Sequence, residues 1–118
     1  MEDKTLHMTM LFDFFGELLT DKQREYFDLY YNEDLSLSEI AKNVGITKQG
    51  VFDIISRAEA LLISTEEKTG LVARFREMQA GIADCIELAG KISDISDNEA
   101  GLLSKKLVSR LEILKGRV

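Results

Sequence analysis

Apolar residues recur every three or four positions along almost the whole chain, the spacing of helices with one buried face. Alternation of the kind that indicates strands is almost absent. The pattern predicts a first helix over about residues 5–19, whose apolar stripe is Leu11, Phe14, Phe15, Leu18 and Leu19. The same periodicity returns after every break in the sequence, so we expect an all-α fold.

Residues that cap helix N-termini mark where the later helices start. Thr20 with Gln23, Ser36 with Glu39, and Ser96 with Glu99 each form the capping-box pattern, and Thr47 caps a further helix. Apolar spacing predicts two more long helices, over about 71–92 and 98–115. The expected organisation is a compact helical unit at 1–65 followed by a two-helix C-terminal arm at 66–118.

The segment between residues 37 and 56 has the pattern of a helix-turn-helix. Ala41 is small where two helices would cross, and Gly45 suits the turn between them because glycine tolerates left-handed backbone. The apolar residues expected to wedge the helices together are Ile40, Val44, Ile46, Val51 and Ile54. An ordinary corner between two helices, without any binding role, would share several of these features.

In a helix-turn-helix, the second helix enters the major groove of DNA. The residues expected to face outward from this helix, or to lie beside it, are Thr47, Lys48, Gln49, Phe52, Ser56, Arg57 and Lys42. Lys48 suits guanine or phosphate, Gln49 suits adenine, and Phe52 suits a thymine methyl group or another protein helix. Thr47 and the helix N-terminus suit a phosphate.

The distribution of charge opposes strong DNA binding. The formal net charge is −6, and residues 1–34 carry an excess of acids equal to that whole value. Affinity for the DNA backbone comes largely from cations that displace counterions. Asp53 lies in the middle of the reading face and is spaced to neutralise Arg57 one turn later. A module that binds protein through the same scaffold therefore stays open as an alternative.

Composition argues against catalytic and metal chemistry. The chain has one histidine and one cysteine, too few for a zinc cluster or a disulfide framework. We expect Cys85 to be buried in a helix, and we expect no enzyme activity, cofactor or metal. No apolar run reaches the roughly 18 residues that a membrane span needs. We therefore expect a cytoplasmic protein without membrane insertion.

The stretches that carry a family resemblance are LFDFFGELLTDKQREYFDLYYNEDLSLSEIA and ITKQGVFDIISRAEALL. Residues 37–63 resemble region 4 of bacterial sigma factors, and the whole chain is more similar to the small YlxM-type helix-turn-helix family. The resemblance implies an all-helical DNA-binding regulator whose gene neighbours those of the signal recognition particle GTPases. It thereby implies a role in that pathway, with components of the particle, including its RNA, as further partners.

The C-terminal arm predicts self-association. Its last helix carries a row of leucines that a small partner unit could not cover fully: Leu103, Leu107, Leu111 and Leu114. Such rows usually bury against another copy, and a homodimer would present two reading helices. Packing of the arm onto its own N-terminal unit is the alternative. The basic residues between Lys105 and Arg117 fit helix-dipole complementation, a phosphate contact, or contact with the acidic N-terminal segment of a second molecule.

Overall fold

The computed structural model describes residues 2–117, and within them it contains helices and no strand. The elements are α1 (Glu2–Phe15), the 3-10 turn η1 (Gly16–Leu18), α2 (Asp21–Tyr31), α3 (Leu37–Val44), α4 (Lys48–Thr69), α5 (Leu71–Asp94) and α6 (Glu99–Arg117). The predicted all-α fold, with its two-helix C-terminal arm, is confirmed. The chain divides into two compact units, one ending at Val72 and the other starting at Ala73.

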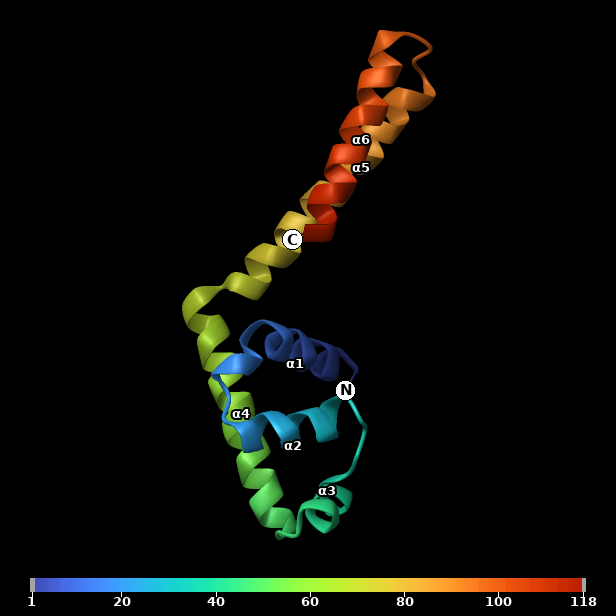
Figure 1. Cartoon of the computed structure of the whole chain (residues 1–118). Coiled ribbons are helices and arrows are strands. Elements are labelled where there is room, and N and C mark those ends of the chain that lie inside the picture. Colours follow the sequence, from blue (N-terminus) through green and yellow to red (C-terminus); the bar gives the residue numbers. More distant parts are fainter. Residues whose placement is uncertain (1, 118) are drawn as a thin grey trace. The chain divides into compact units, whose positions relative to one another are not determined.

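Helix α4 organises the first unit. Its buried residues Val51, Ile55, Ala58 and Leu62 follow one another at three- and four-residue intervals and so form a single apolar stripe. Helices α1, α2 and α3 all contact α4 (Figure 1). The core of this unit is therefore built against one long helix.

The apolar face of α1 is narrower than the sequence predicts. Leu11, Phe15 and Leu19 are buried as expected, whereas Phe14 and Leu18 are exposed, so that part of the predicted stripe was wrong. The α-helix ends at Phe15, and the next three residues form a 3-10 turn. The tighter winding changes the direction in which each later side chain points.

Local capping fixes where the helices of the first unit begin. The capping boxes at Thr20 and Ser36 are both present, each with the cap side chain accepting from a backbone N–H. The bonds between Glu39 and the backbone and side chain of Ser36 lower the pKa of the Glu39 carboxyl. These two predictions from sequence are confirmed.

The second unit is a helical hairpin made from the part of α5 beyond Val72 and from α6. The predicted helices over 71–92 and 98–115 are confirmed, but the capping box at Ser96 was wrong. Helix α6 starts at Glu99, and the side chain of Asn98 accepts from the Ala100 N–H at 3.0 Å. Cys85 is exposed, so the prediction of a buried cysteine was also wrong.

No helix in the described part of the chain combines the length and the apolar character that crossing a bilayer requires.

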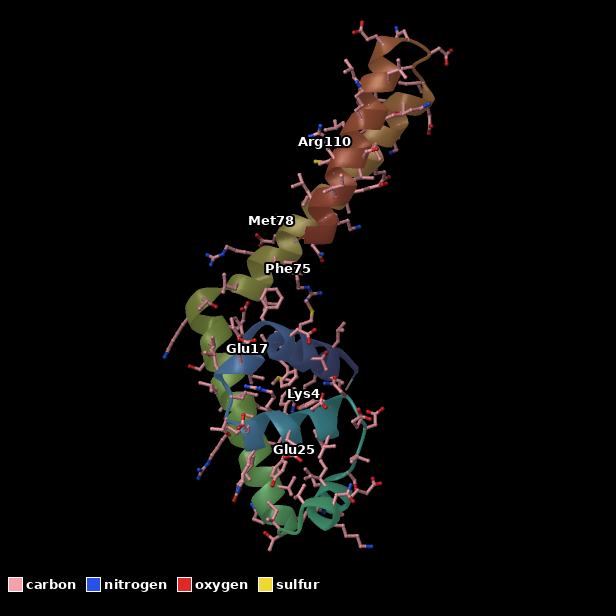
Figure 2. The ribbon with its side chains drawn as sticks, in the orientation of Figure 1. Lys4, Glu17, Glu25, Phe75, Met78 and Arg110 are labelled. Atoms are coloured by element: carbon pink, nitrogen blue, oxygen red, sulfur yellow. The ribbon has the colours of Figure 1, made fainter. Side chains whose placement is uncertain are left out.

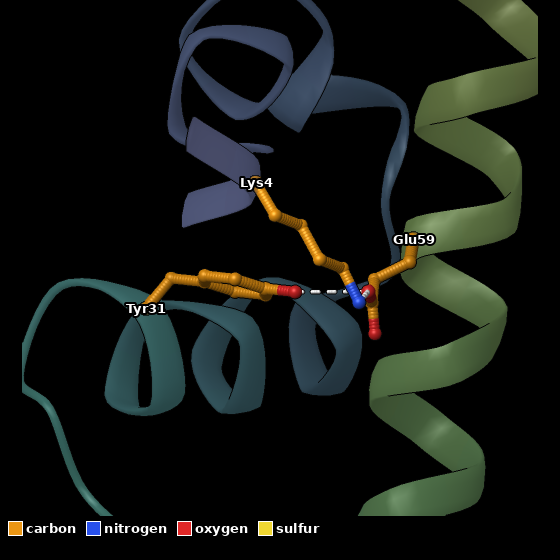
Figure 3. A network of polar contacts seen from close by, with 3 residues as sticks. All are labelled: Lys4, Tyr31 and Glu59. Carbon is orange, nitrogen blue, oxygen red and sulfur yellow. Dashed lines mark hydrogen bonds and ion pairs between the residues drawn. The ribbon is translucent and has the colours of Figure 1, made fainter. Parts of the chain in front are cut away.

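A polar contact joins three helices of the first unit (Figure 3). The Tyr31 hydroxyl of α2 donates to Glu59 Oε2 of α4 at 2.8 Å, and Lys4 Nζ of α1 lies 3.7 Å from the same oxygen. Burial of the phenol, together with its bond to Glu59 and the charge of that carboxylate, raises the pKa of Tyr31. The contact fixes α2 against the middle of α4.

We expect Tyr31→Phe to lower the free energy of unfolding by about 1.5 kcal/mol at pH 7, since it removes a hydrogen bond to a charged group. A tyrosine whose pKa is raised by folding stabilises the fold below its ordinary value of 10.0 and loses that contribution at higher pH. Urea unfolding at several pH values measures both effects. The free energies of unfolding of the wild type and Tyr31→Phe should converge as the pH rises past 10. A difference between them that stays constant with pH would contradict this account.

Candidate nucleic-acid interface

The turn between α3 and α4 is set by two local conformations. Gly45 follows the last residue of α3 with φ 77°, in the left-handed region that glycine tolerates. Thr47 then caps α4, its side chain accepting from the Gly50 N–H at 3.0 Å. Two helices joined by so short a glycine-containing turn have the local geometry of a helix-turn-helix.

The contact between the two helices is small and apolar. Ile40 and Val51 are fully buried, and Ala41 is half-buried as expected of a residue near a helix crossing. Val44 and Ile54 pack at the edge of the core. Ile46 was expected to join this wedge, but its side chain is 39% exposed, so that prediction was wrong.

The residues proposed to read nucleic acid lie at the surface of the first unit. Those that are exposed are Thr47, Lys48, Gln49, Phe52, Arg57 and Lys42. Ser56 is half-buried. Gln49, Phe52 and Arg57 lie about 90–150° around α4 from the stripe that contains Val51 and Ile55, counting 100° per residue. Lys48 is seven residues before Ile55 and so lies close to the line of that stripe, but it is exposed at the first position of the helix.

Asp53 contacts a different neighbour from the one expected. Gln49 Nε2 donates to Asp53 Oδ1 at 3.0 Å, one helical turn apart. Among the residues whose side chains the structure describes, Asp53 forms no ion pair with Arg57, so the predicted neutralisation of that arginine was wrong. The bond restricts the side chain of Gln49 on the exposed face.

An apolar area surrounds Phe52, and sequence reasoning missed most of it. A shallow groove is lined by Leu37, Lys48, Gln49 and Phe52. Phe52 is half exposed, and Ile46 is exposed in the turn before α4. In the sequence, Leu37 could be recognised only as the first residue of α3, directly after the cap Ser36. Its place beside Phe52 results from the packing of α3 on α4.

Acidic side chains gather on other elements of the same unit. Asp13, Glu17, Asp21 and Glu25 are exposed on α1, η1 and α2, around two grooves that share Phe12 and one basic residue, Arg24. Figure 2 labels Glu17 and Glu25 among them. Within the described residues, no group of three or more His, Cys, Asp or Glu side chains could hold a metal ion.

A family model described as "Putative helix-turn-helix protein, YlxM / p13 like" matches residues 2–101. The chain belongs to this family, UPF0122. A family protein of Caldanaerobacter subterraneus is 54% identical over 82 residues, which are 70% of each chain. Over 114 residues, a protein of Halalkalibacterium halodurans is 42% identical and covers 97% of this chain and 96% of its own. A Bacillus cereus protein is 40% identical over 114 residues, covering 97% and 99% respectively.

The resemblance to the YlxM-type family, inferred from residues 1–65, is thereby confirmed for most of the chain. The matched region includes all of α3 and α4 and their turn. The family description agrees with the local geometry at Gly45 and Thr47, which is that of a helix-turn-helix.

We expect Gly45→Ala to lower the free energy of unfolding of the first unit by about 1–2 kcal/mol, because alanine is strained in left-handed backbone. Gly45→Asn is the matched control, since asparagine tolerates this conformation and should cost less. All three tyrosines of the chain lie in α2, so tyrosine fluorescence during urea unfolding reports on this unit. Equal losses for the two variants would contradict the role assigned to Gly45.

Proposed function

We propose that this UPF0122 protein is a regulator that binds DNA, or structured RNA, through the N-terminal half of α4. The observation that carries the proposal is the exposure of Lys48, Gln49 and Phe52 directly after the helix-turn-helix turn. Side chains at these positions of a second helix reach base edges when that helix enters a major groove.

The proposed contacts follow from the chemistry of each side chain. Lys48 contacts guanine or phosphate, and Gln49 contacts adenine while its amide is held by Asp53. The N-terminus of α4 and the Thr47 hydroxyl bind a phosphate, since the first N–H groups of a helix point toward an anion. Lys42 and Arg57 supply further cationic contacts, and Ser56 lies beside Phe52.

The acidic surface limits the affinity. Few cations accompany the reading residues, so few counterions are released on binding. We therefore infer weak to moderate affinity that falls steeply with salt. The acidic side chains of α1 and α2 orient the protein with α4 toward the phosphates.

The cellular setting belongs to the same proposal. The YlxM-type resemblance implies genes beside those of the signal recognition particle GTPases, and we propose that the protein acts in that pathway, in the cytoplasm. We also propose a homodimer, because two copies present two reading helices to paired half-sites.

Charge reversal on the reading face tests the nucleic-acid function. Lys48→Glu and Arg57→Glu should each abolish binding to duplex DNA at about 50 mM salt, while Lys68→Glu, at the far end of α4, should not. Fluorescence anisotropy across a salt series should show log K falling by about 0.9 per phosphate contacted. Absence of binding to both DNA and structured RNA by the wild type would refute the proposal.

A second function, binding of another protein, is favoured by the apolar groove at Phe52. An exposed aromatic beside Leu37 and Ile46 is a typical anchor point for a protein partner. In this reading the signal recognition particle GTPases bind the outward face of α4, and Asp53 supplies a charge at the rim.

The two functions differ in their response to substitutions at this groove. If protein binding is the function, Phe52→Ala and Asp53→Lys should each weaken capture of purified signal recognition particle GTPase at least about tenfold, as expected for an interface anchor. Leu61→Ala, an exposed leucine further along α4, is the control. Unchanged capture by both variants would remove this second function.

A further inference from the structure

The hairpin of the second unit lacks a large-residue core of its own. Among its described residues, only Ala89, Gly101 and Ser104 are buried, and all three are small. Nine large apolar side chains of the same hairpin are exposed: Met78, Leu88, Ile92, Ile95, Leu102, Leu103, Leu107, Ile113 and Leu114. Other large apolar residues of the hairpin, Ile82, Ile86, Val108 and Leu111, are half-buried, so much of its apolar surface is left for a partner to cover.

Part of this apolar surface forms two straight rows, one on each helix. On α5 the row is Met78, Cys85 and Ile92, each seven positions after the one before, so the three lie nearly on one line. On α6 the row is Leu103, Leu107 and Leu114. Figure 2 labels Met78 at one end of the α5 row. The stem of Arg110 lies beside the α6 row and can cover apolar surface with its methylenes.

Both rows lie on the same face of the hairpin. On α5 the members of the row are displaced by about 20–60° from the side that bears Ala89, and on α6 by about 60–100° from the side that bears Ser104, counting 100° per residue. When each helix is viewed along its own N-to-C direction, the two rows are displaced in the same rotational sense. Because the two helices run in opposite directions, equal senses place the two rows on one side. Leu111 shares the inward side with Ser104 and is half-buried.

The exposed area is large for a monomer. The five large side chains of the two rows are each between 46% and 57% exposed. Together they expose on the order of 500 Å², which is near the upper limit of the apolar patches that monomers leave uncovered. With polar residues at the rim, the face approaches the roughly 800 Å² per partner of a standard interface.

Charge along the hairpin indicates what covers this face. The turn, residues 94–99, holds three acids and no base. The open end, residues 74–77 and 110–116, holds four bases and two acids. Two hairpins packed face to face in opposite directions place each acidic turn beside the basic end of the other copy. A parallel arrangement would place like charges together.

We propose that this face binds the same face of a second copy in antiparallel orientation, which forms a four-helix bundle with a twofold axis near Cys85 and Leu107. This proposal rests on the homodimer proposed above and names its surface and its direction. It needs no nucleic acid, so its tests are independent of DNA binding.

Sedimentation velocity of the full chain tests the surface. The wild type should sediment as a dimer at micromolar concentration, and Leu107→Glu should raise the dimer dissociation constant at least about 100-fold, because the dimer would bury two unpaired carboxylates. Leu102→Glu is the matched control, since Leu102 is exposed on α6 but points away from this face. Helix content measured by circular dichroism should be unchanged in both variants. A monomeric wild type would overturn the proposal, and it is the result expected if the arm packs on its own first unit. A wild-type dimer whose dissociation constant does not change in Leu107→Glu would also overturn it.

Spin labels measure the direction of packing. The single cysteine, Cys85, carries a label without further engineering, and its two copies should lie within about 20 Å of each other, since helices in a bundle are 8–10 Å apart. In a Cys85→Ser background, spin labels on Ile95→Cys should lie about 30 Å apart in the two copies. Residue 95 is ten residues from the twofold axis near residue 85, so the distance is twice the rise of ten helical residues. Two closely spaced labels at residue 95 would indicate parallel hairpins and contradict the proposal.

Discussion

One helix carries both the core of the first unit and its candidate binding surface. The buried stripe of α4, from Val51 to Leu62, contacts α1, α2 and α3, while the first two turns of the same helix expose Lys48, Gln49 and Phe52. The direction of the exposed side chains is therefore fixed by the same packing that holds the unit together. The contact of Tyr31 and Lys4 with Glu59 adds a polar constraint on that packing. The packing of α4 therefore sets the orientation of any surface that this helix presents.

The parts of the fold that depend on local rules could be predicted from the sequence. A cap at Thr20 or Ser36, and a left-handed turn at Gly45, involve residues within one helical turn of each other. The errors arose where two local signals compete. Near the hairpin turn both Ser96 and Asn98 can cap a helix, and Asn98 does so. The 3-10 turn after Phe15 begins at Gly16, a weak helix former, but the apolar spacing continues through it to Leu19, and Leu18 is exposed in that turn.

The candidate site, too, could be predicted from the sequence only where local periodicity decides the position of a side chain. Exposure of Gln49 followed from helical periodicity, because Gln49 lies on the side of α4 away from the apolar stripe. Lys48 lies nearly in line with that stripe and is exposed because it is the first residue of the helix. The partner of Asp53 did not follow, since Gln49 and Arg57 are equally spaced from it along the helix. The apolar area at Phe52 depends on Leu37, which belongs to another helix, and its position required the tertiary fold. The surface thus combines polar reading groups with an aromatic anchor, and each of the two proposed functions uses one of these features.

The most direct test is an NMR titration of the isotopically labelled full chain with a random-sequence DNA duplex at about 50 mM salt, a condition that favours phosphate contacts. If α4 is the binding helix, the amide shifts that change should cluster between Lys42 and Arg57, and those of α1 and α2 around Glu17 and Glu25 should stay in place. Shifts confined to the hairpin of α5 and α6, or none at all at saturating duplex, would contradict the assignment of this surface.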